Sequence, residues 1–434
     1  MTAAAPAFPG RALISVPALR HNLALLAALT PQAEPVAVVK ADAYGHGAPL
    51  VAQVMLAAGV KHLAVAQLGE ALELHAHLRA AGCPLPVDGS LLTWLYAPGT
   101  DLTPAVAAGL NLTVSAPWQW EEVASAARAA ARPARVQIQV DTGMTRAGFR
   151  PEQLPVALEV ARALAASGAV EVLGVWTHLA RADSPHPDAV AATRTQLRQF
   201  AAAAQEVRAH FPAAARHALA TSGALFYPEF AFERVRLGIS LYGLAPNAQW
   251  EEESAALPPV VADAAARATE ALNEQATGQA PRWDLSEAAA RWQAVSSQLR
   301  PVMSLHATLV QVSEVPAGTP VSYGGTWQAP TRRWLATVPL GYADGIPRHA
   351  SNAVSVLAAG RLCPQVGRVC MDQFVIDLGP VTGQEPPARV GDEVVLFGAA
   401  PAQSADEWAL ACGTIGYEIV TRVGARVPRV KEEA

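Results

Sequence analysis

From residue 12 to about residue 245, short runs of β-branched and apolar residues alternate with alanine- and leucine-rich stretches of helical period. The short runs predict strands, and segments such as Leu50–Ala58 and Val190–His210 predict helices between them. The eight expected strands are Val36–Lys40, His62–Ala66, Leu91–Tyr96, Asn111–Val114, Arg135–Asp141, Glu171–His178, His217–Ser222 and Arg234–Ile239. This repeated strand–helix pattern favours an α/β fold with a closed (β/α)8 barrel of TIM type over an open doubly wound sheet.

The hydrophobic pattern changes twice after the barrel. Residues 248–300 are acidic and alanine-rich, and from Pro301 onward short alternating strands are separated by Gly and Pro. The strands expected there are Met303–Val315, Leu335–Leu340, Val354–Leu357, Phe374–Leu378 and Glu393–Phe397. We therefore predict a barrel domain over residues 1–247, a helical insertion over 248–300 and a smaller C-terminal all-β domain over 301–434.

The insertion is expected to be ordered and to lie outside the catalytic centre. The alanine density of Ala262–Ala271 and Ala288–Ala290 favours two helices, with a break at Gly278–Pro281. The alternative is a disordered acidic linker. Against it stand three large apolar side chains that need a covering surface, Trp250, Trp283 and Trp292.

Composition narrows the class of protein. With 51% hydrophobic and 16% charged residues and a formal net charge of −5, the chain is a soluble globular protein with no electrostatic reason to bind nucleic acid. No apolar stretch approaches the length of a bilayer span, and the N-terminus lacks a signal segment, so we expect no membrane association and a cytoplasmic location. The four cysteines are widely spaced, and neither a disulfide framework nor a metal site is expected.

Only three of the 32 basic residues are lysines, namely Lys40, Lys61 and Lys431. Lys40 stands out because it follows the apolar run Pro35–Val39, where an ammonium group is costly unless its chemistry uses a lowered pKa. Further polar residues occur at the expected carboxyl ends of barrel strands, where such barrels build their sites: Arg146, His178, Ser222 and Arg236. A lysine that faces glycines and a hydroxyl suited to phosphate suggests pyridoxal 5'-phosphate bound as a Schiff base.

Each of these residues also has a structural explanation when taken alone. Lys40 could be a strand-end lysine that reaches solvent, His178 a satisfied interior histidine, and Arg236 an arginine paired with a carboxylate at the core edge. Their joint placement on successive strand ends favours an enzyme.

The longer motifs identify a family. They are VVKADAYGHG (38–47), DTGMTRAGF (141–149), VRLGISLYGLAP (235–246), VSYGGT (321–326), VPLGYADG (338–345), VGRVCMDQ (366–373) and TIGY (414–417). In this order, over nearly the whole chain, they closely resemble alanine racemase, a pyridoxal-phosphate enzyme of fold-type III. The resemblance implies interconversion of L- and D-alanine, which supplies D-alanine for cell-wall precursors.

The resemblance also assigns roles to residues. Lys40 would carry the cofactor and act as the base on one face of the substrate. The phosphate would be held by Tyr44, Ser222, Gly238, Ile239 and Tyr417. His178 would lie beside the pyridine ring, Arg236 would face its nitrogen and keep it unprotonated, Arg146 would bind the phenolic oxygen, and the Met371 N–H would bind the substrate carboxylate.

Racemisation needs a second proton-transfer group on the opposite face, and the resemblance selects Tyr323 of the β domain. In this family the tyrosine comes from the second subunit, so the resemblance implies a homodimer with shared active sites. A free tyrosine titrates near pH ~10, so the site must lower that pKa or transfer the proton in concert with a neighbour. The resemblance places Tyr342, Tyr417, Asp183, Arg348 and Arg368 along a narrow substrate entrance.

The sequence departs from the family at three places. Gln139 stands where many members carry a carbamylated lysine that orients the phenol-binding arginine, Thr221 replaces the usual asparagine, and the insertion is long and acidic. An anion such as chloride could replace the carbamate, or Arg146 could be held more loosely. The alternatives for function are racemisation of another small amino acid such as serine, a fold-type III decarboxylase, and a pyridoxal-phosphate carrier without catalysis.

Overall fold

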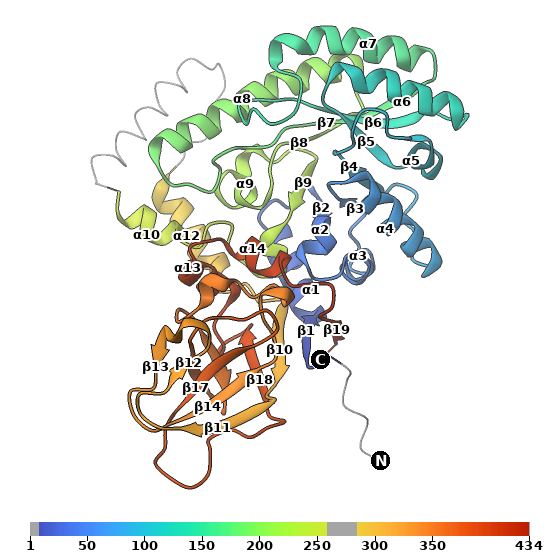
Figure 1. Cartoon of the computed structure of the whole chain (residues 1–434). Coiled ribbons are helices and arrows are strands. Elements are labelled where there is room, and N and C mark those ends of the chain that lie inside the picture. The colour runs from blue at the N-terminus through green and yellow to red at the C-terminus, as the bar shows by residue number, and fades with distance from the viewer. Residues whose placement is uncertain (1–7, 258–283, 434) are drawn as a thin grey trace.

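The computed structural model describes residues 8–257 and 284–433, which form a barrel domain and a β domain joined along one edge (Figure 1). Within this described part, eight parallel strands follow one another in the order β8-β7-β6-β5-β4-β3-β2-β9. They are β2 (Glu34–Val38), β3 (His62–Ala64), β4 (Ser90–Thr93), β5 (Asn111–Val114), β6 (Ala134–Gln139), β7 (Val170–Trp176), β8 (Ala215–His217) and β9 (Arg234–Leu237). The predicted barrel fold is confirmed: seven expected strands overlap observed ones at three or more residues, whereas the expected strand His217–Ser222 shares only His217 with β8.

The barrel is nearly closed between its first and last strands in the sheet order. β8 and β9 share no ladder, but Ala220 and Arg236 form a parallel bridge, and the Arg236 N–H donates to the Leu219 carbonyl at 3.0 Å. β4 and β5 are buried along their whole length, as expected for parallel strands that are covered on both faces. The helices that cover the barrel are α1 (Val16–Ala27), α3 (Ala48–Ala57), α4 (Leu68–Ala80), α5 (Thr103–Ala108), α6 (Pro117–Ala129), α7 (Leu154–Ala166) and α8 (Pro187–His210). Two short helices, α2 (Lys40–Tyr44) and α9 (Thr221–Phe226), follow β2 and β8 at the strand ends.

Several predicted strands were too long at their carboxyl ends. β2 ends at Val38, so Lys40 begins α2, and β8 ends at His217, so Ser222 lies in α9. β7 ends at Trp176, two residues before His178. Beyond these ends the carbonyls of Thr177 and Ala218 accept from the Arg236 guanidinium, while the His217 carbonyl accepts from both Arg236 and the Thr177 N–H.

The β domain is built on a sheet of nine strands in the described residues, ordered β11-β14-β17-β16-β15-β18-β10-β1-β19. These are β11 (Gln311–Val315), β14 (Arg333–Val338), β17 (Phe374–Pro380), β16 (Arg361–Val366), β15 (Ser355–Ala358), β18 (Glu393–Phe397), β10 (Met303–Thr308), β1 (Gly10–Ser15) and β19 (Arg429–Glu432). A separate hairpin pairs β12 (Pro320–Val321) with β13 (Trp327–Gln328). Two helices, α13 (Ala405–Cys412) and α14 (Gly416–Thr421), lie between this sheet and the barrel (Figure 1).

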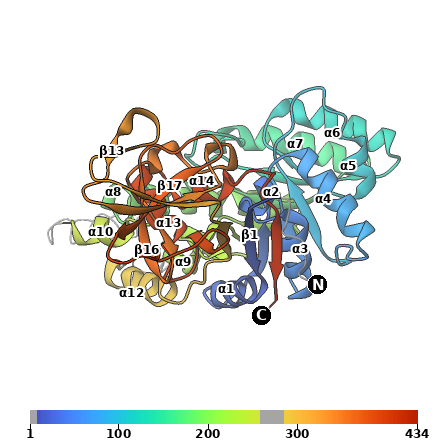
Figure 2. The ribbon, with the colours of Figure 1, turned by 60° about the horizontal axis from the view of Figure 1, so that its bottom comes forward.

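One strand crosses the predicted domain division. β1 lies in the range predicted for the barrel domain, yet it pairs antiparallel with β10 and parallel with β19 of the C-terminal sheet. Figure 2 shows the first and last strands of the chain side by side. Gly10 permits close packing here, because a Cβ at this position would lie 2.7 Å from the Leu340 side chain. Most buried apolar residues of the barrel and of the β domain form one continuous core, and Val321, Leu335 and Val366 form a separate small cluster in the β domain.

The described parts of the insertion are helical and packed. They form α10 (Trp250–Ala255) and α12 (Leu285–Ser296), so the helix expected around residues 288–290 is confirmed. Trp250 and Trp292 are buried and contact the Phe226 ring, with centroid distances of 5.0 and 6.4 Å. The predicted helix at 262–271, the predicted break and Trp283 lie outside the described residues.

Candidate active site

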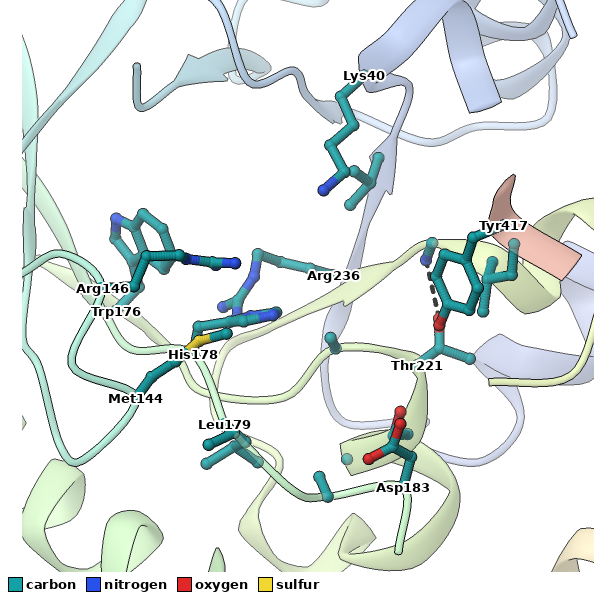
Figure 3. Close-up of a pocket in the computed structure, with 18 of the residues that line it drawn as sticks. Lys40, Met144, Arg146, Trp176, His178, Leu179, Asp183, Thr221, Arg236 and Tyr417 are labelled. Carbon is teal, nitrogen blue, oxygen red and sulfur yellow. Dashed lines mark hydrogen bonds between the residues drawn. The ribbon is translucent and has the colours of Figure 1, made fainter. Parts of the chain in front are cut away.

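A cavity of about 260 Å³ opens at the carboxyl ends of the barrel strands. Ten of the residues selected from the sequence line it: Lys40, Tyr44, Arg146, His178, Asp183, Ser222, Arg236, Gly238, Ile239 and Tyr417. Figure 3 shows Lys40 pointing into the cavity toward Arg236 and Arg146, with Tyr417 and Thr221 on another wall. The barrel half of the predicted site is therefore assembled within one chain.

Lys40 enters the cavity from an unusual stretch of backbone. Residues 41–44 all have φ between 51° and 54°, which is left-handed backbone that costs energy for residues with a Cβ. Glu70 and Asp42 stabilise this turn, since their carboxylates accept hydrogen bonds from the N–H groups of Ala41 (2.5 Å) and Ala48 (2.7 Å). The turn ends at Gly45, where a Cβ would lie 2.2 Å from the Val420 carbonyl oxygen of α14. The left-handed turn therefore fixes Lys40 and Tyr44 against the cavity.

The Lys40 ammonium lies between aromatic rings and near two cations. Its Nζ is 5.8 Å from the Trp94 ring centroid and 5.9 Å from that of Tyr44. Burial lowers the pKa of Lys40, and the charges of Arg146 and Arg236 lower it further. A larger share of neutral amine at neutral pH is what a nucleophile or a base requires.

Arg236 is a fixed cation on the cavity wall. Its Nη1 donates to the His217 carbonyl at 2.8 Å, and its Nη2 donates to the carbonyls of Thr177 at 2.7 Å and Ala218 at 3.1 Å. In the described part of the chain its Nε has no hydrogen-bond partner and remains available to a ligand. Burial lowers the pKa of Arg236 to about 9, so the guanidinium is still charged at neutral pH.

His178 adds a neutral side chain beside this cation. Arg236 Nη2 donates to His178 Nδ1 at 3.3 Å. Burial and the charge of Arg236 lower the pKa of His178 to about 3, so its ring is uncharged at neutral pH. The ring can therefore lie against a flat ligand without adding charge.

Two predicted contacts differ in detail from the structure. The Gly238 N–H, expected to bind phosphate, donates to Thr221 Oγ1 at 2.9 Å, so the threonine that replaces asparagine is part of the cavity wall. Gly238 still permits a close approach, since a Cβ there would lie 2.8 Å from Tyr44 Oη. Gln139 Nε2 donates to the Ala147 carbonyl at 3.2 Å, and no hydrogen bond joins Gln139 to Arg146 among the described residues.

The β-domain half of the predicted site lies elsewhere on the chain. Tyr323, Tyr342 and Met371 are 70%, 41% and 54% exposed, and none of them lines the cavity. They are neighbours of one another: Ser322 Oγ donates to the Arg368 carbonyl at 2.7 Å, and the N–H groups of Tyr342 and Ala343 donate to the carbonyls of Cys370 at 3.0 Å and Met371 at 2.9 Å. We call Tyr323, Tyr342 and Met371 the β-domain cluster.

Tyr323 stands on a constrained turn. It begins a short 3₁₀ helix (Tyr323–Gly325), and its two neighbours along the chain, Ser322 and Gly324, have φ of 62° and 74°. Left-handed backbone at a serine is strained, and such strain is concentrated at functional sites. The exposed ring of Tyr323 is thus held on a fixed support.

Sequence reasoning missed several residues of the site. Trp94, Trp176 and Met144 line the cavity, and Trp176 lies under Arg236 with its ring centroid 5.1 Å from the guanidinium carbon. Both tryptophans belong to or follow predicted barrel strands, so they could have been found by asking which large side chains end those strands.

Both halves of the chain match known family models. The alanine racemase N-terminal domain model matches residues 14–246, and the alanine racemase C-terminal domain model matches residues 302–431. The chain belongs to the alanine racemase family. Members of this family are pyridoxal-phosphate-dependent isomerases, as the resemblance implied.

Individual relatives agree over the full length. The alanine racemase of Beutenbergia cavernae is 41% identical, with 98% of each chain covered, and that of Streptomyces coelicolor is 42% identical, with 97% of this chain and 95% of that protein covered. Among solved structures, alanine racemase from D-cycloserine-producing Streptomyces lavendulae has a TM-score of 0.81 at 37% identity and covers 99% of this chain and 98% of its own. Alanine racemase from Bartonella henselae with covalently bound pyridoxal phosphate has a TM-score of 0.73 at 26% identity, covering 98% and 100%. These matches do not favour the serine alternative.

Proposed function

We propose that this protein interconverts L- and D-alanine and that Lys40 and Tyr323 transfer protons on opposite faces of the substrate. The observation that carries the proposal is the Lys40 amine inside a cavity whose buried cation, Arg236, keeps one N–H free. Family membership and full-length similarity to alanine racemases support it. The product D-alanine would serve cell-wall precursor synthesis in the cytoplasm. Among the described residues, no helix has the length and apolar character needed to cross a membrane.

The residues of the cavity fit pyridoxal phosphate. Lys40 offers an amine to its aldehyde, the free Nε of Arg236 suits the ring nitrogen, and Arg146 suits the phenolic oxygen. Ser222, Tyr44 and Tyr417 bring hydroxyl groups, and Gly238 and Ile239 bring backbone, to the wall proposed for the phosphate. When bound, this cofactor supplies the electron withdrawal that acidifies the α-proton of an amino acid.

The protein side chains then move the protons. Lys40 Nζ would take the α-proton on one face, which its lowered pKa favours. The Tyr323 hydroxyl would donate on the other face, and the Met371 N–H would hold the substrate carboxylate. Tyr342, with Asp183, Tyr417, Arg348 and Arg368, would line the entrance and select short side chains.

The separation of the β-domain cluster from the cavity supports a homodimer. Since Tyr323 is 70% exposed and does not reach the cavity of its own chain, a second copy must bring it to Lys40 for both residues to act on one substrate. We also propose the division of the chain into residues 1–247, 248–300 and 301–434, with β1 contributed to the last of these.

Exchange of the α-proton into deuterated water tests the function. Alanine should exchange and racemise, serine more slowly, and leucine and arginine at least about 100-fold more slowly, because a narrow entrance excludes them. Mass spectrometry measures the exchange of the α-proton for deuterium, and the loss of optical rotation measures racemisation. Leucine rates comparable to those of alanine would contradict the proposed substrate.

A further inference from the structure

A line of buried polar groups runs from the barrel interior to the cavity and ends at Arg236. Gln137 on β6 and His217 on β8 are each 1% exposed, and neither lines the cavity. His217 Nε2 is 2.7 Å from Gln137 Oε1, and Arg236 Nη1 is 2.9 Å from His217 Nδ1. Arg236 is thus connected to an amide on the opposite side of the imidazole.

The chemistry of the three groups fixes where the imidazole proton lies. A guanidinium has only donors, so His217 Nδ1 must be the acceptor of the Arg236 N–H. The single proton of a neutral imidazole is then on Nε2 and needs an acceptor, which Gln137 Oε1 provides. Burial and the nearby charge of Arg236 keep the pKa of His217 well below its ordinary value, which agrees with a neutral ring.

The neighbouring residues leave little freedom for another arrangement. The His217 and Trp176 rings are stacked at 5.9 Å with an interplanar angle of 9°, and the same Trp176 ring lies under the guanidinium. Gly174 on β7 leaves room for the Gln137 amide, because a Cβ there would lie 3.0 Å from Gln137 Oε1. The imidazole is thus held in plane between a donor and an acceptor.

We propose that Gln137 and His217 are positioning residues, with Gln137 selecting the His217 tautomer that directs Arg236 Nε into the cavity. This inference rests on the proposed function for its consequence. Arg236 directed in this way would donate to the ring nitrogen of the bound cofactor and disfavour its protonation. Misdirection of Arg236 would increase the side reaction in which alanine leaves as pyruvate and its amino group stays on the cofactor.

The first measurement needs no variant of Gln137. Nitrogen-15 NMR of the full-length holoprotein, labelled at histidine and assigned with His217→Ala, should show the His217 proton on Nε2 between pH 6 and 9. A proton on Nδ1 would overturn the proposal.

The second measurement uses two replacements and a matched control. In Gln137→Met the acceptor is lost, and in Gln137→Glu a carboxylate favours the imidazolium, whose second N–H would face Arg236. Both should raise the number of amino-transfer events per racemisation turnover at least about tenfold. Gln119→Glu changes a buried amide whose oxygen accepts from the N–H groups of Ser115 and Ala116, and it should leave this ratio unchanged.

A wild-type ratio in both Gln137 variants would overturn the positioning role. If Gln137→Met does not fold, Gln137→Glu keeps the side-chain volume and carries the test. A protein with its His217 proton on Nε2 but without α-proton exchange on alanine would contradict the proposed function and support the tautomer assignment. A His217 proton on Nδ1 in a protein that does exchange the α-proton of alanine would contradict this inference and leave the proposed function intact.

Discussion

The barrel half of the proposed site is enclosed within one chain, whereas the β-domain half is exposed on its surface. Around the cavity, Arg236 is 4% exposed and bound to three carbonyl oxygens, whereas Tyr323 in the β-domain cluster is 70% exposed. Yet Tyr323 stands on a strained turn rather than on a loose loop. In the homodimer proposed above, the cofactor site would be preformed in each subunit, and the second proton-transfer group would be preformed for the other subunit.

The largest effect is expected from the barrel half. Lys40→Ala should reduce racemisation by at least about 10³-fold and abolish the Schiff-base absorbance, because it removes both the cofactor link and a proton-transfer group. Borohydride reduction followed by peptide mapping should place the cofactor on Lys40. Linkage to Lys61, which is paired with Asp88 at the surface, would contradict the assignment.

Mixing two inactive variants tests whether Lys40 and Tyr323 of one active site come from different subunits. Lys40→Ala and Tyr323→Phe should each be inactive alone, and after subunit exchange the mixture should regain roughly a quarter of wild-type activity, because half of the dimers are hybrids with one intact site. Subunit exchange is followed with differently tagged chains. Absence of recovery in a mixture that has exchanged would show that both residues act within one chain.

The barrel half also depends on the insertion. Trp292 packs on Phe226 at the end of α9, and Arg291 Nε donates to the Leu225 carbonyl at 3.2 Å, so α12 supports the helix that carries Thr221 and Ser222. Trp292→Ala should lower the free energy of unfolding by about 3–5 kcal/mol, measured by denaturant titration. The control, Gln293→Ala on the exposed side of the same helix, should change it by less than about 0.5 kcal/mol. Equal effects of the two would mean that α12 does not brace α9.

The smallest effect is expected from bicarbonate, which could act only through a carbamate that orients Arg146. Gln139 is neutral and bonded to the Ala147 carbonyl, so no carbamate is expected at this position and activity should not change when bicarbonate is added. Initial rates with and without bicarbonate, at constant pH and ionic strength, test this. A clear gain would mean that carbamylation occurs at another residue.

Motifs and spacing predicted most of this architecture. The alternation of strands and helices gave the barrel, and Asn111–Val114 and Glu393–Phe397 were placed with their observed ends. Strand ends near the cavity were misplaced because hydrophobic patterning cannot show where an apolar run leaves the ladder, or that the carbonyls of residues 177 and 218 accept from a guanidinium instead. The left-handed turn at 41–44 was equally hidden, because alanine and tyrosine disfavour this backbone and an aspartate adopts it only as a single residue.

The sequence predicted those site residues that lie in motifs resembling the family's, and missed those whose place depends on packing. The resemblance selected ten residues that line the cavity, but Trp94, Trp176 and the Gln137–His217 pair depend on which side chains face inward in the barrel. The place of β1 was also missed. A short strand with partners at the far end of the chain leaves no local signal.

The position of β1 has a consequence for biosynthesis and for dissecting the protein. The chain emerges N-terminus first, so β1 is made before β10 and β19 exist, and the C-terminal sheet can close only after synthesis is complete. A fragment of residues 301–434 expressed alone would expose the unpaired edges of β10 and β19 and should aggregate. A synthetic peptide of residues 8–16, added in trans, could occupy the vacant place between them, as a donated strand does in assemblies that exchange strands.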